Sequence, residues 1–145
     1  MPNAKNFFTI EQQEDIRQAI MNAELDTSGE IRVHIENTCT GDTLERALTV
    51  FKKLGMEKTA SRNGVLIYLA VKNRKFAIIG DKGINDVVSE NYWDSIKSKM
   101  INHFRENQFT EGLVEAIIET GIQLKKNFPY QTDDKNELSD EISFN

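Results

Sequence analysis

The chain has 145 residues, of which 39% are hydrophobic and 28% charged, a composition typical of one soluble globular domain with a single apolar core. The net charge of −5 and the scattered basic residues argue against binding to the phosphate backbone of nucleic acids. The single cysteine, Cys39, excludes an internal disulfide and a multi-cysteine zinc site.

No apolar run reaches the roughly 18 residues of a membrane span. The first residues, Met-Pro-Asn-Ala-Lys, lead into Phe7 and Phe8 without the apolar core of a signal peptide. We therefore expect a soluble, cytoplasmic protein with no membrane span and no nucleic-acid partner.

The first helix is predicted to begin at Thr9, whose hydroxyl can cap it while Gln12 reaches back. Apolar residues at helical spacing follow, namely Ile16, Ala19, Ile20 and Ala23. Residues 31–36 then alternate strictly between apolar and polar. They predict a strand with one covered face and with Arg32, His34 and Glu36 on the other.

A second helix should begin after Asp42, which is spaced to cap it with Glu45. Its expected buried stripe is Leu44, Ala47, Leu48 and Phe51. Residues 65–71 are apolar on both faces, which predicts an inner strand that runs parallel to 31–36.

The two residues 73–74 are too few for a crossover, so strand 75–80 must return antiparallel. A third helix is predicted after Ser89 and a fourth over about 110–127. The third helix carries Trp93, Ile96, Met100 and Phe104 on one side. Gly112 and Gly121 in the fourth predict close helix packing.

These elements, a helix, βαββ and two helices, predict an α/β fold in which helical layers cover both faces of a small mixed sheet. Residues 1–130 form a single domain in this interpretation, and the polar, acidic residues 131–145 form a disordered tail. Because the hairpin reverses direction, residues 80–83 should return to the rim that carries 28–30 and 61–64.

That rim carries the main candidates for chemistry. Asp81 lies between Gly80 and Gly83 and could bind Ca²⁺ or Mg²⁺ together with Asp86 and Asn63, because these hard cations prefer oxygen ligands. The alternative is that Asp81 only shapes a turn.

Two basic residues lie at the same rim. Lys82 and Arg62 could bind a phosphate oxygen or neutralise charge in a transition state, or could be ordinary solvated charges.

The opposite rim offers a second set of candidates, Glu36, Cys39 and Asp42, with His34 two residues inward. A Cys–His pair can be nucleophilic, and His34 with Glu36 could contribute to a metal site. The alternative interpretation places His34 under a helix, Cys39 in a loop or core, and Asp42 at a helix N-terminus.

A resemblance to a known family rests on three stretches: Thr-Ser-Gly-Glu-Ile-Arg-Val at 27–33, Arg-Asn-Gly-Val-Leu-Ile-Tyr-Leu-Ala at 62–70 and Phe-Ala-Ile-Ile-Gly-Asp-Lys-Gly-Ile at 76–84. With Phe109-x-x-Gly112-Leu113 and Gly121-x-x-Leu124, they resemble the TPM domain over residues 8–129. The resemblance implies a Rossmann-like three-layer α/β/α sandwich, binding of Ca²⁺ or Mg²⁺, and acid-phosphatase activity in some members. Other members resemble accessory factors of membrane complexes.

This chain departs from the family pattern in two places. Relatives often have an acidic residue where this chain has Arg62, and Gly-Tyr-Gly-Leu-Glu where this chain has residues 80–85. Asp81 and Asp86 are natural substitutes for the missing acids. The chain also lacks the leader and the membrane anchor usual in the family, so we expect a stand-alone soluble form.

Three functional hypotheses follow. The first is a divalent-metal-dependent phosphomonoester hydrolase in which Asp81, Lys82 and Arg62 are catalytic and Asp81, Asp86 and Asn63 bind the metal. The second is a non-enzymatic module that binds Ca²⁺ or Mg²⁺ and engages a protein partner. The third is thiol chemistry at Cys39.

Overall fold

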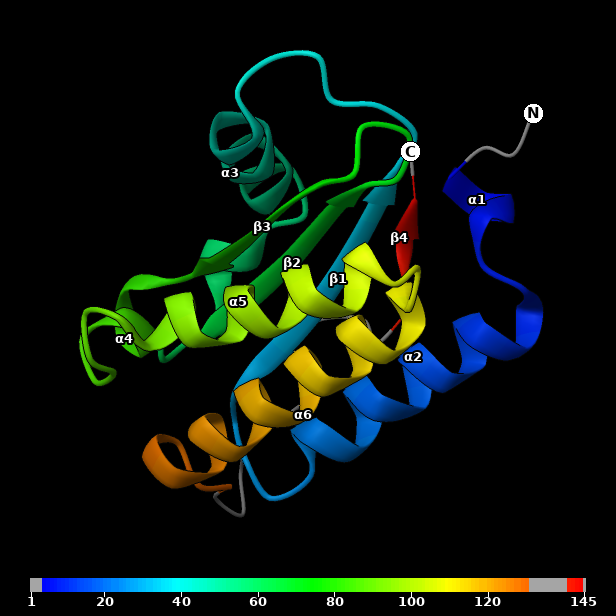
Figure 1. The fold of residues 1–145 in the computed structure, drawn as a ribbon. Coiled ribbons are helices and arrows are strands. Elements are labelled where there is room, and N and C mark those ends of the chain that lie inside the picture. The colour runs from blue at the N-terminus through cyan, green and yellow to red at the C-terminus, as the bar shows by residue number, and fades with distance from the viewer. Residues whose placement is uncertain (1–3, 131–140, 145) are drawn as a thin grey trace.

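The computed structural model describes residues 4–130 and 141–144 (Figure 1). The helices are α1 (Ala4–Phe7), α2 (Ile10–Glu24), α3 (Thr43–Lys53), the 3₁₀ helix η1 (Met56–Lys58), α4 (Lys82–Asn85), α5 (Tyr92–Arg105) and α6 (Phe109–Asn127). The strands are β1 (Glu30–Glu36), β2 (Gly64–Ala70), β3 (Lys75–Gly80) and β4 (Ser143–Phe144). Among the described residues, no helix is both long and apolar enough to cross a bilayer.

The four strands form one mixed sheet in the order β3-β2-β1-β4. β1 runs parallel to β2 along its whole length, from the pair Glu30 and Gly64 onward, and β3 returns antiparallel to β2. Both features confirm the predicted crossover and hairpin. Arg74 in the hairpin turn has a positive φ of 53°.

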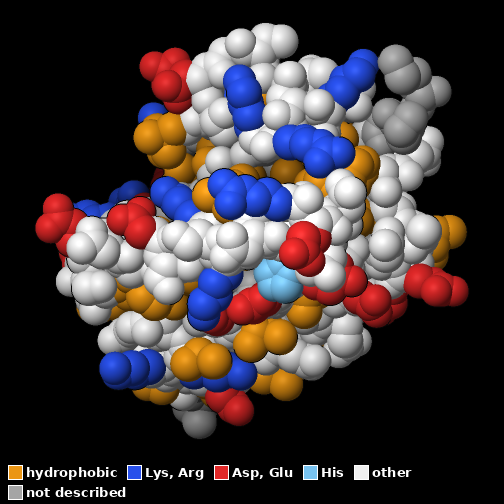
Figure 2. Space-filling view, viewed as in Figure 1, with side chains coloured by type: hydrophobic (Ala, Val, Ile, Leu, Met, Phe, Trp, Pro, Cys, Tyr) orange, Lys and Arg blue, Asp and Glu red, His pale blue; other side chains and the backbone are white. Residues whose placement is uncertain are grey.

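Helices cover both faces of the sheet, with α2, α5 and α6 on one side and α3 on the other (Figure 1). This arrangement confirms the predicted Rossmann-like three-layer α/β/α sandwich with a mixed sheet. The predicted capping box of α2 is also present, with Thr9 and Gln12 each accepting a backbone N–H of the other. On the face shown in Figure 2, basic, acidic and apolar side chains are interspersed.

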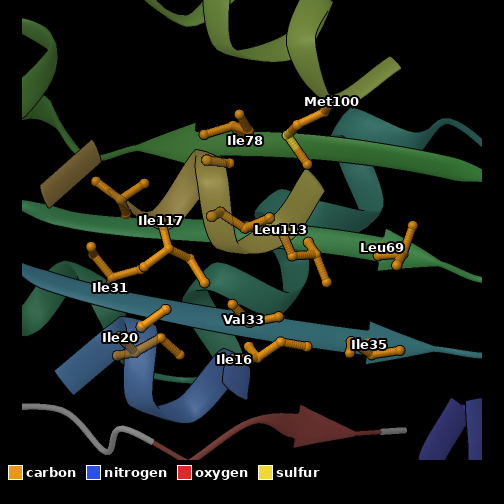
Figure 3. Close-up of a cluster of buried hydrophobic side chains, with 14 of the residues drawn as sticks. Ile16, Ile20, Ile31, Val33, Ile35, Leu69, Ile78, Met100, Leu113 and Ile117 are labelled. Carbon is orange, nitrogen blue, oxygen red and sulfur yellow. The ribbon is translucent and has the colours of Figure 1, made fainter. Parts of the chain in front are cut away.

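The larger core lies between the sheet and α2, α5 and α6 (Figure 3). Ile20, Ile31 and Ile117 are completely buried there. Burial of each such side chain contributes about 1.5–3 kcal/mol relative to an exposed position. A smaller core between the sheet and α3 includes Phe51, Met56 and Cys39.

Two glycines of α6 allow its close contact with neighbouring helices. A Cβ atom on Gly121 would lie 2.6 Å from the Cβ of Ala23 in α2, and one on Gly112 would lie 2.8 Å from a ring atom of Phe104 in α5. The predicted close packing of this helix is therefore confirmed.

The prediction that β1 has only one covered face was wrong. His34 and Glu36, which alternate with the apolar residues, are 3% and 4% exposed. They are buried because Tyr68 of β2, Arg46 of α3 and Ser143 of β4 contact them. Side chains from three elements thus cover the polar face of this strand.

The predicted buried stripe of α3 was wrong at two positions. Leu44 and Leu48 are 54% and 42% exposed, whereas Ala47, Val50 and Phe51 are buried. The helix is rotated so that Val50 and Leu54, rather than the two leucines nearer its N-terminus, pack on the sheet.

The start of α5 also differs in detail from the prediction. Asn91 precedes its first residue, and Ser89 contributes its backbone carbonyl, which accepts the N–H of Tyr92 at 3.0 Å, rather than a side-chain cap. Ile96, Met100 and Phe104 are buried as predicted, while Trp93 is half-buried.

Most of the predicted acidic tail, residues 131–140, lies outside the described part of the chain. Within the segment 131–145 that was predicted to be a disordered tail, Ser143 and Phe144 instead form β4, which pairs in parallel with β1 at His34 and Ile35. This strand was not predicted from the sequence.

Candidate functional site

Three loops that are distant in sequence meet at one rim of the sheet, as the topology predicted. The side-chain amide of Asn63 donates to the hydroxyl of Ser28 at 3.2 Å. The backbone N–H of Gly83 donates to the carbonyl of Arg62 at 2.7 Å. The loop between α2 and β1, the residues before β2 and the turn after β3 are therefore in direct contact.

Asp81 is the central side chain of this rim. It is 6% exposed, and it caps α4 by accepting the N–H of Lys82 at 2.7 Å. Its Oδ2 and Oδ1 also accept from Nε and Nη2 of Arg62, at 2.7 and 2.8 Å. The hydrogen bond to Asp81 raises the pKa of the Arg62 guanidinium.

This pairing decides how well the rim suits a cation. Both oxygens of Asp81 accept hydrogen bonds from Arg62, so a metal ion at Asp81 would compete with the guanidinium. Asn63 is fully buried, and its Oδ1 has no hydrogen-bond partner, whereas Asp86 is exposed at the far end of α4. Across the described residues, no three His, Cys, Asp or Glu side chains are grouped so as to hold a metal. Of the three predicted ligands, Asp81 and Asn63 thus lie at this rim, and Asp86 lies at the far end of α4.

Position 83 is occupied by glycine because a larger residue would clash with the neighbouring loop. A Cβ atom at Gly83 would lie 2.0 Å from the carbonyl oxygen of Ser61 and 2.6 Å from that of Arg62. No side chain fits between the start of α4 and this loop. The segment from Gly80 to Gly83, which contains Asp81 and Lys82, is therefore packed tightly against the loop of Ser61 and Arg62.

The opposite rim, where β1 ends, contains a hollow of about 560 Å³. It is lined by residues 36–42 and by Glu45, Arg46 and Thr49 of α3. In open α/β sheets, ligands bind outside the carboxyl ends of the strands, and this hollow occupies that position.

Glu36 forms the inner wall of the hollow and accepts hydrogen bonds from three side chains. Arg46 donates through Nε and Nη2, at 2.8 and 2.7 Å, and the hydroxyl of Tyr68 and Nε2 of His34 complete the cluster. Burial alone would raise the pKa of Glu36, but these hydrogen bonds outweigh it and hold the pKa at about 2. Glu36 is therefore ionised at neutral pH.

The pKa values of the partners of Glu36 are shifted as well. The hydrogen bond to Glu36 raises the pKa of Arg46. Burial and, secondly, the hydrogen bond to Glu36 raise the pKa of Tyr68. Burial lowers the pKa of His34. Because the Glu36 carboxylate can only accept, Nε2 of neutral His34 donates to it, and Nδ1 accepts from the hydroxyl of Ser143 at 2.9 Å.

The lining of the hollow also includes oxygen atoms of the kind that hard cations bind. Asp42 caps α3 by accepting the N–H of Glu45 at 2.9 Å, and both carboxylates are exposed. The side-chain oxygen of Asn37 is buried and has no hydrogen-bond partner. Carboxylate and amide oxygens of this kind are the ligands that Ca²⁺ and Mg²⁺ take in proteins.

The predicted Cys–His alternative is not assembled in the described residues. Cys39 is 5% exposed within the smaller core, its backbone N–H donates to Asn73 at 2.7 Å, and its sulfur contacts the carbonyl of Gly41. His34 is engaged by Glu36 and Ser143 instead.

Arg46 and Tyr68 were not predicted from the sequence as residues of this site. The available signal was a tyrosine within an otherwise aliphatic strand, opposite His34 in the parallel register. A buried phenol needs a partner, and the polar positions of β1 supply one.

The fold and the two rims define an α/β/α domain with a hollow at the carboxyl edge of its parallel strands. The chain matches the family model of the TPM domain, TPM_phosphatase, over residues 3–122 and belongs to that family. No curated protein matches it in sequence.

Several solved structures share the fold. The BA42 protein of the psychrophilic bacterium Bizionia argentinensis is 47% identical, with a TM-score of 0.89 and 96% coverage of each chain. The N-terminal domain of a P. gingivalis protein is 18% identical, with a TM-score of 0.72 over 86% of this chain and 82% of that one. The N-terminal domain of cg2496 from Corynebacterium glutamicum is 13% identical, with a TM-score of 0.66 over 86% and 79%.

Proposed function

We propose that the chain is a divalent-cation-dependent phosphomonoester hydrolase whose cation and substrate meet in the hollow between Glu36 and α3. Membership of the TPM domain family, whose model is named for a phosphatase, supports the reaction class. The position of the hollow at the carboxyl end of β1 is the observation that carries the choice of site.

The cation would be Ca²⁺ or Mg²⁺, and Asp42, Glu45 and the side-chain oxygen of Asn37 would hold it. Among the described residues, no three His, Cys, Asp or Glu side chains are grouped to hold a metal here either, so the fit depends on the two exposed carboxylates and on the Asn37 oxygen, which has no other partner. When bound, such a cation polarises a phosphoryl oxygen and lowers the pKa of a bound water.

The N-terminus of α3 and Arg46 would orient the phosphate. The backbone N–H groups of Thr43 and Leu44 belong to the first turn and have no intrahelical acceptor. Together with the helix dipole they favour an anion, and the Arg46 guanidinium adds a positive charge on the hollow wall.

Glu36 would act as a positioning residue. Its pKa of about 2 excludes it as a general acid near neutral pH, and its two hydrogen bonds fix the plane of the Arg46 guanidinium. Tyr68 stays protonated because its pKa is raised, so it holds Glu36 without taking part in proton transfer.

The rim that carries Asp81, Lys82 and Arg62 is the alternative site for the same activity. There Lys82 is exposed, and both carboxylate oxygens of Asp81 already accept hydrogen bonds from Arg62. A cation at this rim would compete with that guanidinium for Asp81, which favours the hollow as the cation site.

Hydrolysis of p-nitrophenyl phosphate with Mg²⁺, with Ca²⁺ and with EDTA tests the proposal. The double variant Asp42→Asn/Glu45→Gln should lose activity, and Asp81→Asn should retain it. Asp94→Asn, an exposed carboxylate on α5, is the matched control. Activity that survives both EDTA and the double variant would overturn the proposal.

Amide NMR shifts during a Ca²⁺ or Mg²⁺ titration locate the ion directly. Shifts concentrated at 36–46 support the hollow, and shifts at 26–30, 60–64 and 80–87 assign the ion to the Asp81 rim. Cation binding without turnover would favour the non-enzymatic cation-binding interaction module instead.

A further inference from the structure

The C-terminal strand β4 contributes one side chain to the cluster of His34, Glu36, Arg46 and Tyr68. Ser143 lies opposite His34 in the parallel register of β1 and β4 (Figure 1), and its hydroxyl is 2.9 Å from Nδ1 of the imidazole. The two residues are 109 positions apart in the sequence. The contact therefore forms only when the C-terminal segment is paired with the sheet.

The surroundings of His34 make this contact hard to replace. The residue is 3% exposed, and its ring stacks on that of Tyr68, with the ring centroids 6.0 Å apart and an interplanar angle of 14°. Among the described residues, Nδ1 has no other hydrogen-bond partner, so removal of the hydroxyl would leave a buried acceptor unpaired. The hydroxyl of Ser143 therefore favours the tautomer in which Nε2 carries the proton.

The proton on Nε2 connects His34 to Glu36. Nε2 donates to Oε1 of Glu36 at 3.3 Å, and the same oxygen accepts from Nη2 of Arg46 at 2.7 Å. Oε2 accepts from Nε of Arg46 at 2.8 Å. Because two parallel hydrogen bonds join the carboxylate to the guanidinium, the orientation of one group fixes that of the other. A change at His34 should therefore reach Arg46.

Arg46 presents the exposed end of this chain of contacts. Its side chain is 32% exposed, against 5% for that of Glu36, and it lines the hollow. Ser143 is not among the residues that line the hollow, so it does not touch a ligand there. An effect of Ser143 on ligand binding would have to pass through His34 and Glu36.

We propose that Ser143 is a positioning residue of the hollow, whose hydroxyl fixes the ring of His34 and, through His34 and Glu36, the orientation of the Arg46 guanidinium. The part of this inference that concerns phosphate rests on the proposed function, whereas the part that concerns the ring and the guanidinium does not. The hollow is then complete only when β4 pairs with β1.

The first measurement follows the chain of contacts by NMR without any ligand. At neutral pH, the ¹⁵N shifts of the His34 ring should show a protonated Nε2 and an unprotonated Nδ1. In Ser143→Ala these two shifts should move toward each other, because both tautomers become populated, and the Nε proton of Arg46 should exchange faster with water. Unchanged signals of both residues in this variant would overturn the proposal.

Two variants serve as controls for the NMR measurement. Ser143→Thr keeps the hydroxyl and should restore the signals of His34 and Arg46. Ser95→Ala removes a hydroxyl at an exposed position of α5 and should change neither signal. Equal signal changes in Ser95→Ala and Ser143→Ala would also overturn the proposal, because the effect would then not depend on the contact with Nδ1.

The second measurement tests whether the orientation of Arg46 affects an anion in the hollow. The probe is inorganic phosphate, whose Kd is measured by calorimetry in the presence of Mg²⁺. Ser143→Ala should raise this Kd about two- to tenfold, as expected for the loss of one hydrogen bond, and Ser143→Thr should restore it. An unchanged Kd in Ser143→Ala would overturn the positioning role, because the contact would then serve the fold alone.

A double-mutant cycle identifies the route of the effect. Once Glu36→Gln has broken the link to Arg46, the addition of Ser143→Ala should raise the Kd for phosphate no further. An equal further increase would overturn the proposal, because Ser143 would then act by another route. If Glu36→Gln does not fold, as judged by circular dichroism, His34→Gln takes its place in the cycle.

The same variants separate this inference from the proposed function. With p-nitrophenyl phosphate as substrate, Ser143→Ala should raise KM by the factor found for phosphate and change kcat less. Phosphate binding that responds to Ser143→Ala, without hydrolysis by the unaltered chain, would overturn the hydrolase and support the positioning role. If the unaltered chain does not bind phosphate at all, the positioning role is overturned.

Discussion

The guanidinium group of Arg62 binds both carboxylate oxygens of Asp81, with Nε to Oδ2 at 2.7 Å and Nη2 to Oδ1 at 2.8 Å. Arg62 precedes β2 and Asp81 follows β3, so the pair closes the open end of the β-hairpin. The carboxylate is buried and the arginine is half-exposed. The same carboxylate caps α4, so one side chain connects the hairpin, the loop and the helix.

Asp81→Ala should destabilise the fold. The substitution removes the N-cap of α4, which typically costs about 0.5–2 kcal/mol, and leaves Arg62 without its partner. Asp81→Asn keeps an oxygen for the cap and should lose less. Urea unfolding of both variants measures the difference. If Asp81→Ala is as stable as the unaltered chain, the Asp81 cap and its ion pair with Arg62 contribute nothing to the free energy of unfolding.

Gly83→Ala should destabilise the fold by about 1–3 kcal/mol or more, because the added Cβ would lie 2.0 Å from the carbonyl oxygen of Ser61. The backbone must move to relieve this contact, and the hydrogen bond from Gly83 to Arg62 would weaken. Gly41→Ala is the control, since no atom other than those of Gly41 and its two chain neighbours lies within 4 Å of its Cβ position. Thermal unfolding that ranks the two variants equally would contradict the packing argument.

The Glu36 cluster predicts a loss of stability in acid. The pKa of Glu36 is about 2 in the folded chain, against an ordinary value of 4.5. Its contribution is fully present above pH 4.5 and is lost as the pH falls toward 2, and it amounts to about 3 kcal/mol. Urea unfolding between pH 6 and pH 2.5 measures this slope, which Glu36→Gln should flatten. An unchanged slope in that variant would assign the acid sensitivity to other carboxylates.

The two histidines should respond to pH in opposite directions. Burial lowers the pKa of His34, so its neutral form stabilises the fold above its ordinary pKa of 6.5, and stability falls as the pH drops below that value. Hydrogen bonds to Glu115 and Gln108 raise the pKa of His103, whose contribution is present below pH 6.5 and is lost as the pH rises through the raised value.

NMR titration of the two imidazole rings tests this assignment. The resonances of His34 should titrate below pH 6.5 and those of His103 above it. His103→Gln should remove only the upper titration, and His34→Asn only the lower one. Titration of both rings at the same pH would mean that His34 is not buried in solution.

Periodicity was sufficient to predict the α/β/α layers, the crossover and the hairpin, because long helices and an apolar inner strand carry strong patterns. It also predicted that the loops at 28–30, 61–64 and 80–83 meet, since strand direction alone decides which ends share a rim. β4 was not predicted because a strand of two residues, Ser143 and Phe144, is too short to show a periodic pattern of apolar and polar residues.

The side-chain contacts at both rims depend on three-dimensional geometry, which the pattern of residue types along the sequence does not specify. The glycines on either side of Asp81 and Lys82 indicated a turn. The ion pair between Asp81 and Arg62, however, depends on how closely the two loops approach each other. Likewise, Leu44 and Val50 are both compatible with an amphipathic α3, and only the rotation of the helix against the sheet buries one of them.

Cation binding in the hollow should raise thermal stability, because a ligand that binds only the native state stabilises it. The gain is about 2.7 kcal/mol when the free cation is at 100 times its Kd. Differential scanning fluorimetry with Ca²⁺ and with Mg²⁺ should show the increase, and EDTA should reverse it. Asp42→Asn/Glu45→Gln should abolish the increase, whereas Asp94→Asn should preserve it. If Asp81→Asn abolishes it instead, the ion binds at the rim of Arg62 and separates the pair that closes the hairpin.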